Sequence, residues 1–549
     1  MRPVEALIRI LREEGVTRVF GNPGTTELPF LDALVDHPDI EYVLGVHEGS
    51  VVAMADGYAR ATGRPAFVSL HVAAGLANGL SGLLNASRSR TPLVVTAGQQ
   101  DRRHLAQDPM LSGDLVGLAR PAVKATFDVQ HAQDLPVMVR RAFRLAVLPP
   151  AGPVFLSVPM DLLAEETEVT LFDAPVAPPP VATGVDDAAA LLAGARHPVV
   201  VAGDGVGREG GVGSLVTIAE ALGAAVYHQP MHDGLDFPMD HDLYAGVLPP
   251  VNAEIRAALA PYDVVLIAGC HAFMPHHYSP GPAIPPGTRV VQVDSDPTEI
   301  GRNFTVACGL TGALGPTLQR LAAALPDPSD APEAQRRRCT LRQRHLEQRA
   351  AIDTAALKAY GRAPLDPLAA VHAVASGLPD DAVVLEEAIT AGVLLRRVLR
   401  LARPRSLVHT LGGGLGFGIG AAVGTAMGDP TRPVVAVLGD GCSMFGLQGL
   451  WAAAHHAVPV TFVVMNNGEY RTLKDTLDGW DSRATRAGHY PGLDLGGLDF
   501  TVAAAFFGVE ARRITHVDEL VQLVSDAAHR SGPLLIDVPL LGHQQGARP

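Results

Sequence analysis

Two neighbouring apolar runs in the C-terminal third of the chain constrain its fold more than any other feature. The runs, at 434–438 and 460–465, have the length of buried strands and are separated by a helix-length stretch around 447–456. This order predicts a parallel βαβ unit. Asp440 follows the first run between two glycines, and Asn467 follows the second run before Gly468. Because parallel strands end at the same edge of a sheet, these two polar side chains are predicted to lie side by side.

The two turns present oxygen atoms of the kind that bind hard divalent cations. Asp440 offers a carboxylate, Asn467 offers an amide oxygen, and the turn after Asn467 can offer a backbone carbonyl, all suited to Mg²⁺ or Ca²⁺. Mg²⁺ prefers few protein oxygens together with phosphate groups, so this incomplete set indicates a diphosphate as the additional ligand. The alternative interpretation is two ordinary strand-to-turn junctions of an α/β domain.

The stretch from Gly439 to Asn467 resembles the metal- and diphosphate-binding motif of the thiamine diphosphate enzymes in residue types and separation. The resemblance implies thiamine diphosphate as cofactor, with Mg²⁺ or Ca²⁺ held by Asp440, Asn467 and the main-chain carbonyl of Glu469. It also implies that Leu415 braces the bent cofactor and that Gly413 contacts its aminopyrimidine ring. Further cofactor contacts are implied at Thr390, Gly441, Cys442, Ser443, Asn467, Glu469 and Tyr470, with Glu387 in the same loop as Thr390.

The composition indicates a compact globular protein and argues against several classes of partner. Of the 549 residues, 47% are hydrophobic and 18% charged, which suits about three domains of ordinary size. The net charge of −14 argues against a nucleic acid or an anionic membrane as partner. The four cysteines show no C-x-x-C spacing, so neither a zinc site nor a disulfide framework is indicated. Without a signal peptide or an apolar run of about 20 residues, the chain is predicted to be cytoplasmic.

Changes in composition divide the chain into three predicted α/β blocks. Residues 1–173 alternate helix-like and strand-like segments, which predicts a parallel sheet covered by helices. A proline-rich stretch at 174–183 precedes the second block at 184–325, and residues 326–359 are predicted to form a linker with a charged surface helix. The third block, 360–549, holds the metal motif. The predicted fold is α/β with three doubly wound parallel-sheet domains, which the resemblance assigns to pyrimidine binding, a Rossmann-like middle domain and diphosphate binding.

The middle block contains a G-x-G-x-x-G match from Gly205 to Gly210 after the strand-like run at 198–202. Such a match can bind a dinucleotide, but no acidic residue ends the next strand-like run at 224–227. An ordinary strand-to-helix turn is therefore favoured over NAD or FAD binding. Asp204 repeats the Gly-Asp-Gly of Asp440, yet the residue at the matching separation is Met231 instead of asparagine. This second copy is predicted to be only a tight turn.

Glu48 opens a helix-like stretch in the first block. A glutamate in a first helical turn ordinarily serves only to interact favourably with the helix dipole. Residues 48–59 nevertheless resemble the family's glutamate helix, in which this carboxyl group hydrogen-bonds the aminopyrimidine ring and activates the thiazolium carbon. That chemistry needs an acid in an apolar site, where its proton stays available to a ring nitrogen. In the family this glutamate comes from the neighbouring subunit, which implies at least a homodimer, with a homotetramer expected.

Further segments, at 20–30, 70–75 and 96–100, resemble the benzoylformate decarboxylase branch of the family, and the resemblance extends over essentially the whole chain. It implies that His71 and His276 handle protons, although a lone histidine is more often structural. It also places Thr25 where that branch has a serine in contact with the substrate carboxylate. The extra methyl group of threonine is expected to crowd the pocket and to change the preferred substrate shape.

The resemblance implies a carbon–carbon lyase that converts a benzoylformate-like 2-oxo acid to an aldehyde and CO₂, with side carboligation. Residues 470–476 are more polar than in that branch, and Arg471 or Lys474 near the pocket would favour a polar or aliphatic acid, unless these charges face solvent. Two alternatives stay open. One is an acetolactate-synthase-like carboligase, whose pattern after the second asparagine is not matched here. The other is a non-catalytic scaffold, for which a lost Glu48 or metal ligand would be the expected sign.

Overall fold

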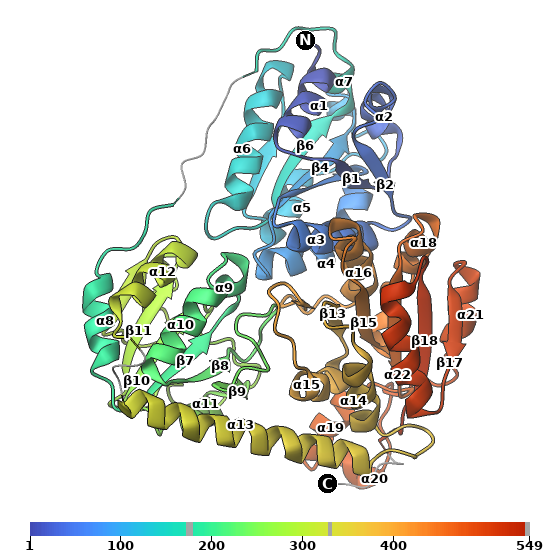
Figure 1. Cartoon of the computed structure of the whole chain (residues 1–549). Helices are drawn as coiled ribbons and strands as arrows, with labels where there is room; N and C mark the ends of the chain where they lie inside the picture. Colours follow the sequence, from blue (N-terminus) through green and yellow to red (C-terminus); the bar gives the residue numbers. More distant parts are fainter. Residues whose placement is uncertain (172–178, 328–331, 544–549) are drawn as a thin grey trace. The chain divides into compact units, whose positions relative to one another are not determined.

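The computed structural model describes residues 1–171, 179–327 and 332–543, and it contains three six-stranded parallel sheets flanked by helices (Figure 1). The chain divides into two compact units. The first comprises Met1–Val176, Ala359–Leu394 and Thr410–Pro549, and the second comprises Ala177–Lys358 and Leu395–His409. The first sheet and most of the third belong to the first unit, and the second sheet belongs to the second unit. The predicted α/β fold with three parallel-sheet domains is confirmed.

The first sheet has the strand order β2-β1-β3-β4-β6-β5. Its strands are β1 (Arg18–Gly21), β2 (Glu41–Leu44), β3 (Ala66–Leu70), β4 (Leu93–Gln99), β5 (Ala125–Asp128) and β6 (Val154–Pro159). Its helices are α1 (Pro3–Glu13), α2 (Leu28–Leu34), α3 (Glu48–Thr62), α4 (Val72–Arg88), α5 (Leu115–Ala119), α6 (Leu135–Val147) and α7 (Met160–Ala164). Val4, Leu7, Ile8 and Leu11 form the apolar stripe that packs α1 into the core. α3 ends at Gly63, whose φ of 69° suits a helix C-terminus.

The second sheet has the order β12-β11-β10-β7-β8-β9. Its strands are β7 (Pro198–Ala202), β8 (Ala225–His228), β9 (Tyr244–Val247), β10 (Val264–Ala268), β11 (Arg289–Asp294) and β12 (Cys308–Thr311). Its helices are α8 (Val185–Ala193), α9 (Asp204–Arg208), α10 (Val212–Leu222), α11 (Asn252–Leu259), α12 (Leu314–Ala324) and α13 (Pro332–Lys358). The G-x-G-x-x-G segment forms most of the short helix α9 and the residues after its end, directly after β7, so it belongs to a strand-to-helix junction as predicted.

The third sheet has the order β14-β13-β15-β16-β18-β17. Its strands are β13 (Val383–Glu387), β14 (Leu407–Val408), β15 (Val434–Gly439), β16 (Val460–Asn466), β17 (Glu510–Arg513) and β18 (Leu534–Pro539). Its helices are α14 (Pro367–Gly377), α15 (Ile389–Val398), α16 (Phe417–Gly428), α17 (Asp440–Ser443), α18 (Gln448–His455), α19 (Arg471–Gly479), α20 (Arg483–Ala487), α21 (Phe500–Phe506) and α22 (Val517–Ser525). The predicted βαβ unit is β15-α18-β16, and its strands pair in parallel.

In each sheet, the chain connections leave one pair of neighbouring inner strands in opposite directions, and ligands in open α/β sheets bind at such switch points. The switch point lies between β1 and β3 in the first sheet, between β7 and β10 in the second and between β13 and β15 in the third. Among the predicted site residues, His71 directly follows β3 and Asp440 directly follows β15. The fold therefore places both at the positions where this architecture binds ligands.

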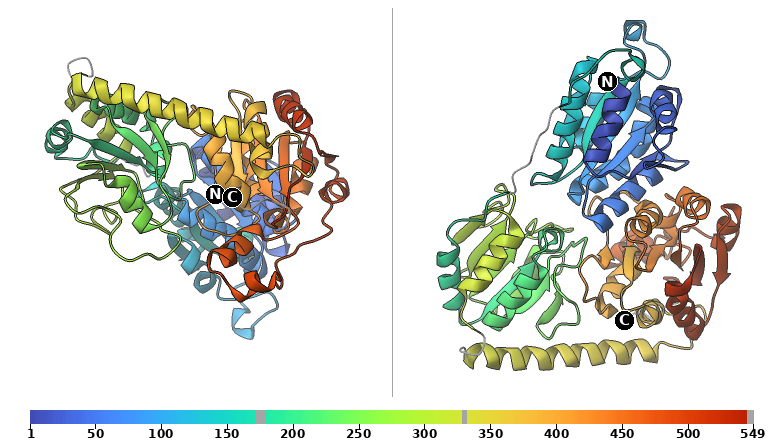
Figure 2. Two further views of the ribbon diagram at one scale, coloured as in Figure 1. Left: turned by 90° about the horizontal axis from the view of Figure 1, so that it is seen from below. Right: turned by 45° about the horizontal axis from the view of Figure 1, so that its top comes forward.

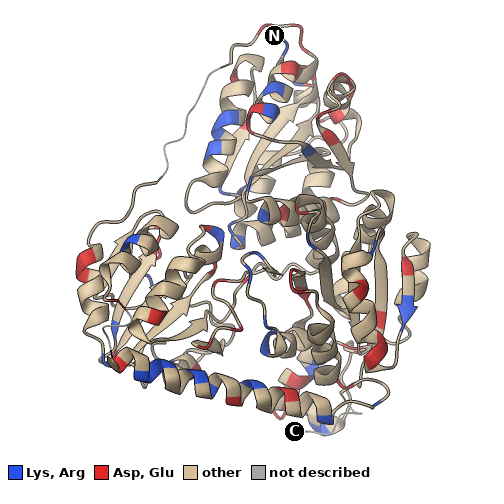
Figure 3. Ribbon diagram, in the orientation of Figure 1, with Lys and Arg blue, Asp and Glu red and all other residues tan. Residues whose placement is uncertain are grey.

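The predicted charged helix between the second and third blocks is α13, which is continuous over 27 residues. Figure 2 shows it from two further sides, and Figure 3 shows basic and acidic residues distributed along it. Only Ala334, His345 and Ala356 of this helix are buried, which agrees with a solvated surface helix. The predicted linkers at 174–183 and 326–359 lie partly outside the described residues. Within those residues, no helix has both the length and the apolar character needed to cross a membrane.

Candidate active site

The two turns of the metal motif meet at the carboxyl edge of the third sheet. β15 and β16 are adjacent parallel strands, with Gly439 opposite Met465. Asp440 begins α17, and its Oδ1 accepts a hydrogen bond from the N–H of Gly441 (2.7 Å). Its Oδ2 accepts one from the N–H of Gly468 (2.7 Å), which belongs to the second turn. The two turns are therefore neighbours, as their spacing predicts.

Asp440 is buried, and its charge is only partly compensated by the protein. Burial raises the pKa of its carboxyl group, and backbone N–H groups of both turns offset part of this rise. The second predicted ligand, Oδ1 of Asn467, accepts a hydrogen bond from the N–H of Glu469 (3.0 Å). These oxygens fit a cation that takes its other ligands from phosphate and water. No cluster of three or more His, Cys, Asp or Glu side chains suited to a metal occurs within 1–171, 179–327 and 332–543.

The side chain of Glu469 is engaged away from the predicted metal position. Its Oε2 accepts a hydrogen bond from Nζ of Lys474 (2.5 Å), and its Oε1 accepts one from the N–H of His543 (2.5 Å). This leaves the main chain of Glu469 for the predicted metal contact. Lys474 is buried and also pairs with Asp494, so its charge is compensated within the protein instead of facing solvent. Arg471 is bound to Asp475 through its Nε (2.8 Å).

The other predicted cofactor contacts lie on segments beside the metal turns. Gly413 is exposed and has a φ of 71°, a conformation that favours glycine, and the half-buried Leu415 follows in the same loop. An added Cβ at Gly441 would lie 2.7 Å from the ring of Tyr470, so any larger residue there would have to displace this ring. Thr390 lies in the first turn of α15, and Cys442 and Ser443 lie in α17. Their contacts with a cofactor stay predictions.

Glu387 fixes the start of α16 directly after the Gly413–Leu415 loop. Its two carboxyl oxygens accept hydrogen bonds from the N–H groups of Phe417 (3.1 Å) and Gly418 (2.8 Å). An added Cβ at Gly418 would lie 2.9 Å from Oε2 of Glu387, so the helix approaches this carboxyl group closely. Glu387 therefore positions the loop that is predicted to contact the cofactor.

The pKa of Glu387 gives a pH-dependent stability that can be measured. Burial raises this pKa from its ordinary value of 4.5 to about 8, although the N–H groups of Gly418, Phe417 and Gly416 oppose the rise. Between these two values the folded protein holds a proton that the unfolded chain has released, so the free energy of unfolding falls as pH rises. We expect the thermal midpoint to fall less steeply with pH over this range in Glu387→Gln than in the wild type. If the thermal midpoint depends equally on pH in the two proteins, the raised pKa of Glu387 is contradicted.

Glu48 is held by two amide side chains at the start of α3. The residue is 6% exposed, and its carboxylate accepts hydrogen bonds from Nδ2 of Asn22 (3.1 Å) and Nδ2 of Asn78 (3.0 Å). The helix begins after His47, whose Nδ1 accepts a hydrogen bond from the N–H of Gly49 (3.1 Å). Two neutral donors fix the orientation of the carboxylate without pairing it with a cation. It can therefore exchange one of these bonds for a bond to a ligand.

Helix α4 connects the Glu48 helix to the Gly413 loop within the first unit. Asn78 binds Glu48, and seven residues further along α4 the side chain of Asn85 binds Gly414. Nδ2 of Asn85 donates to the carbonyl oxygen of Gly414 (2.8 Å), and Oδ1 accepts from its N–H (3.0 Å). Residues seven apart lie on one helix face, about 10 Å from each other along the axis. One chain thus brings these two elements together, and the expectation that Glu48 serves a neighbouring subunit stays a prediction.

The predicted proton-handling residues have different surroundings. His71 follows β3, its side chain is 22% exposed, and its Nδ1 lies 2.8 Å from Oε2 of Glu27. Thr25 is exposed, whereas the next residue, Thr26, is buried and lies 3.1 Å from Nδ1 of His71. His276 is exposed in the second unit, with its Nδ1 3.0 Å from Nε2 of His277. His71 and His276 belong to different units, so their pairing stays a prediction.

Comparison with known proteins identifies the family. Three profiles match in chain order: "Thiamine pyrophosphate enzyme, N-terminal TPP binding domain" at 1–118, the central domain at 185–321 and the C-terminal TPP binding domain at 390–538. A benzoylformate decarboxylase of Pseudomonas aeruginosa is 36% identical over 544 residues, which cover 97% of this chain and 98% of that protein. The chain belongs to the thiamine pyrophosphate enzyme family. Thiamine pyrophosphate is the same compound as thiamine diphosphate, so the predicted cofactor class is confirmed.

Other relatives of this thiamine pyrophosphate enzyme include both decarboxylases and synthases. The structure of a thiamine diphosphate-dependent 4-hydroxybenzoylformate decarboxylase from Rhodococcus jostii RHA1 matches with a TM-score of 0.87 and 32% identity, covering 99% of this chain and 100% of that one. The acetolactate synthase isozyme 3 large subunit of Escherichia coli is 29% identical and covers 95% of this chain and 91% of that protein. Family membership alone therefore does not separate decarboxylation from carboligation.

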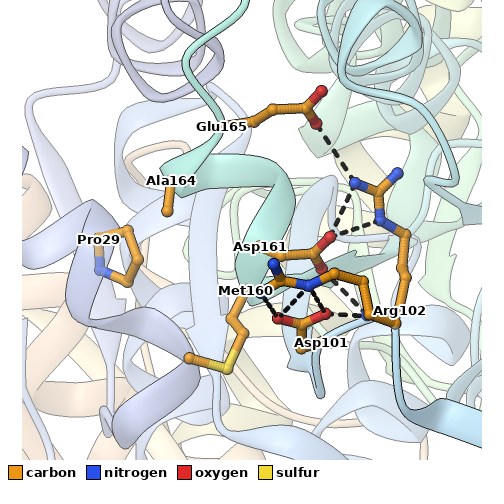
Figure 4. Close-up of a pocket in the computed structure, with 8 residues that line it drawn as sticks. Pro29, Asp101, Arg102, Met160, Asp161, Ala164 and Glu165 are labelled. Atoms are coloured by element: carbon orange, nitrogen blue, oxygen red, sulfur yellow. Dashed lines mark hydrogen bonds and ion pairs between the residues drawn. The ribbon is translucent and has the colours of Figure 1, made fainter.

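A separate pocket of about 620 Å³ lies in the first domain of this thiamine pyrophosphate enzyme, beside the ends of β4 and β6 (Figure 4). Arg102 points into it and is bound by Asp161 (2.8 Å) and Glu165 (3.3 Å), so its charge is compensated. Arg103 is similarly paired with Asp101. Because these charges are already paired within the protein, the pocket does not indicate a ligand class. Its lining residues are Pro29, Asp101, Arg102, Arg103, Met160, Asp161, Ala164 and Glu165.

The sequence interpretation missed four polar residues that hold the predicted site residues in place: Asn22, Glu27, Asn78 and Asn85. Each contacts a residue from a segment distant in sequence, so no local pattern reveals the contact. Asn22 and Glu27 do lie in the segment at 20–30 that carries the family resemblance. These two residues could have been identified by asking what each polar residue of that segment contacts.

Proposed function

We propose that the chain is a thiamine diphosphate-dependent decarboxylase that converts an aromatic 2-oxo acid, benzoylformate in the first instance, to an aldehyde and CO₂. The observation that carries the proposal is that Glu48 and His71 both adjoin the first turn of α4. His71 directly precedes this helix, and an added Cβ at Gly75 in its first turn would lie 3.0 Å from Oε1 of Glu48. A carboxyl group and an imidazole that adjoin the same helical turn can serve acid–base steps at one bound ligand.

The residues present fit a diphosphate cofactor with a divalent cation. Asp440, Asn467 and the main chain of Glu469 would hold the cation, and the Gly413–Leu415 loop would contact the cofactor rings. When bound, thiamine diphosphate supplies the carbon nucleophile and accepts the electron pair that CO₂ leaves behind. Glu48 would hold and exchange a proton at its carboxyl oxygens. Nε2 of His71 would deliver a proton to the carbon that becomes the aldehyde, with His276 as a second proton carrier.

Two observations support decarboxylation over the alternatives. The Pseudomonas aeruginosa benzoylformate decarboxylase is 36% identical to this chain, compared with 26–30% for the acetolactate synthase subunits. Both Glu48 and Asp440 are present and buried, whereas a scaffold on this fold would have no need to keep either. Carboligation stays the second candidate, because the same cofactor supports both reactions.

The proposal is tested with a panel of aromatic and aliphatic 2-oxo acids, using purified protein with thiamine diphosphate and Mg²⁺. We expect turnover of benzoylformate to require both additions and to exceed turnover of pyruvate. Ca²⁺ in place of Mg²⁺ tests the choice of metal, and light scattering tests the proposed dimer or tetramer. Turnover confined to aliphatic acids would overturn the aromatic substrate class. Efficient conversion of pyruvate to acetolactate would favour the carboligase.

A further inference from the structure

Glu27 is a buried carboxylate with hydrogen bonds from three separate segments. It ends a short 3₁₀ helix (Thr25–Glu27) and is 4% exposed. Its Oε1 accepts hydrogen bonds from the hydroxyl of Thr26 (2.6 Å) and the N–H of Gly98 (3.1 Å). Its Oε2 accepts one from the N–H of Gly24 (2.9 Å) and lies 2.8 Å from Nδ1 of His71. Two partners on each oxygen leave this carboxylate little freedom to turn.

The contact with Glu27 determines which ring nitrogen of His71 carries the proton. A carboxylate only accepts hydrogen bonds, so Nδ1 of His71 must be the donor in this contact. The hydroxyl group of Thr26 donates its hydrogen bond to Glu27. It therefore cannot also donate to Nδ1 of His71, which stays the donor in its contact with Glu27. Nε2 makes no hydrogen bond with any residue that the structure describes, and the ring is partly exposed. The neutral ring therefore presents a free lone pair on Nε2.

The backbone packs closely around the side chains of Glu27 and His71. An added Cβ at Gly24 would lie 2.3 Å from the ring of His71, and one at Gly98 would lie 2.2 Å from Oε1 of Glu27. Val72, directly after His71, has a φ of 43°, which is strained for a β-branched residue. Strain of this kind persists where the surrounding structure enforces it, and it is concentrated at functional sites. Close packing and a strained turn thus hold the ring in one position.

We propose that Glu27 is the positioning residue of His71, and this inference rests on the proposed function. Glu27 keeps the proton on Nδ1, so that Nε2 faces the ligand as the acceptor. When Nε2 takes up a proton, the imidazolium is stabilised by the adjacent carboxylate, and the same proton then leaves from Nε2 to the substrate carbon. Glu27 accepts the hydrogen bond throughout and takes up no proton itself.

A double-mutant cycle tests the inference through activity. We expect Glu27→Gln to lower kcat about 10–100-fold, the range typical of groups that orient another catalytic group, with little change in KM. The double variant Glu27→Gln/His71→Ala is expected to be no slower than His71→Ala alone, because Glu27 acts only through His71. Losses that multiply would show that Glu27 has a different role and would overturn the inference.

A second test needs no activity and separates this inference from the proposed function. Diethyl pyrocarbonate reacts with neutral imidazole, and mass spectrometry of the peptide that carries His71 gives its reaction rate at each pH. Glu27→Gln removes the negatively charged acceptor of the hydrogen bond from Nδ1, so the midpoint of the His71 reaction should move to lower pH. Thr26→Val, which keeps Glu27, is expected to leave the midpoint where it is in the wild type. An unmoved midpoint in folded Glu27→Gln, as judged by circular dichroism, overturns the inference, whereas a moved midpoint in a protein without decarboxylase activity overturns only the proposed function.

Discussion

Replacement of Glu48 by glutamine is expected to lower turnover about 10²–10⁴-fold, the usual contribution of a general acid or base. Glutamine has nearly the same shape, but it cannot exchange an acidic proton. Its NH₂ group would also face the amide donors of Asn22 or Asn78, which now donate to the two carboxylate oxygens. The measurement is kcat with saturating thiamine diphosphate and Mg²⁺, together with cofactor affinity from quenching of tryptophan fluorescence.

The matched control for Glu48→Gln is Glu41→Gln in the same domain. Glu41 lies on the edge strand β2 and forms an exposed ion pair with Arg18. Exposed pairs contribute about 0–1 kcal/mol, so this control should have nearly wild-type turnover and stability. The account requires that Glu48→Gln still binds the cofactor. If the variant keeps full turnover, or if it loses turnover only because it no longer binds cofactor, the assigned role of Glu48 is wrong.

Replacement of Asp440 by asparagine is expected to weaken Mg²⁺ binding at least about 100-fold, the upper end of the range for groups that merely orient a metal ligand. Asparagine removes the negative charge, and its NH₂ group would face the N–H of Gly441 or Gly468. Because the cation is expected to bridge protein and diphosphate, cofactor affinity should fall with it. Titration of Mg²⁺ at fixed thiamine diphosphate, followed by fluorescence quenching, measures both effects.

The chain contains its own control for this experiment in the second Gly-Asp-Gly tripeptide. Asp204 is also buried, and it accepts hydrogen bonds from the N–H of Asp233 (2.8 Å) and the amide of Gln229 (2.5 Å). No asparagine stands at the matching separation from Asp204, so Asp204→Asn should leave Mg²⁺ affinity unchanged. Equal losses in the two variants would mean that the effect is on folding instead of on a metal site.

The elements around the metal motif could be predicted because their signals are local. Residues 434–438 and 460–465 are apolar almost throughout, and they form β15 and β16 with one further residue each at the C-terminal end. Helix α3 begins at Glu48 and ends before Gly63, which agrees with the helix predicted to begin at Glu48. Parallel strands that are adjacent end at the same edge of the sheet, which is why the sequence alone places Asp440 and Asn467 together.

The contacts that orient the site could not be predicted, because they join distant segments. Glu27 meets His71 across 44 residues and Gly98 across 71 residues, and the packing of the whole first domain sets these distances. Lys474 shows a different limit of sequence reasoning. Its charge left two interpretations open, a polar pocket wall or solvent exposure. Its burial and its pairing with Glu469 and Asp494 exclude solvent exposure, whereas a position near the substrate stays a prediction. A sequence gives the charge of a side chain, whereas only the fold gives the partner that compensates it.

The most direct test of the account is the simultaneous measurement of CO₂ and benzaldehyde released from benzoylformate by the purified protein with thiamine diphosphate and Mg²⁺. A non-oxidative decarboxylase should release the two products in equal amounts, and Glu48→Gln should release almost none of either. CO₂ without a matching amount of aldehyde, with the missing carbon found in a 2-hydroxy ketone, would contradict the account and identify a carboligase. Absence of both products from protein that has bound its cofactor would contradict the proposed substrate.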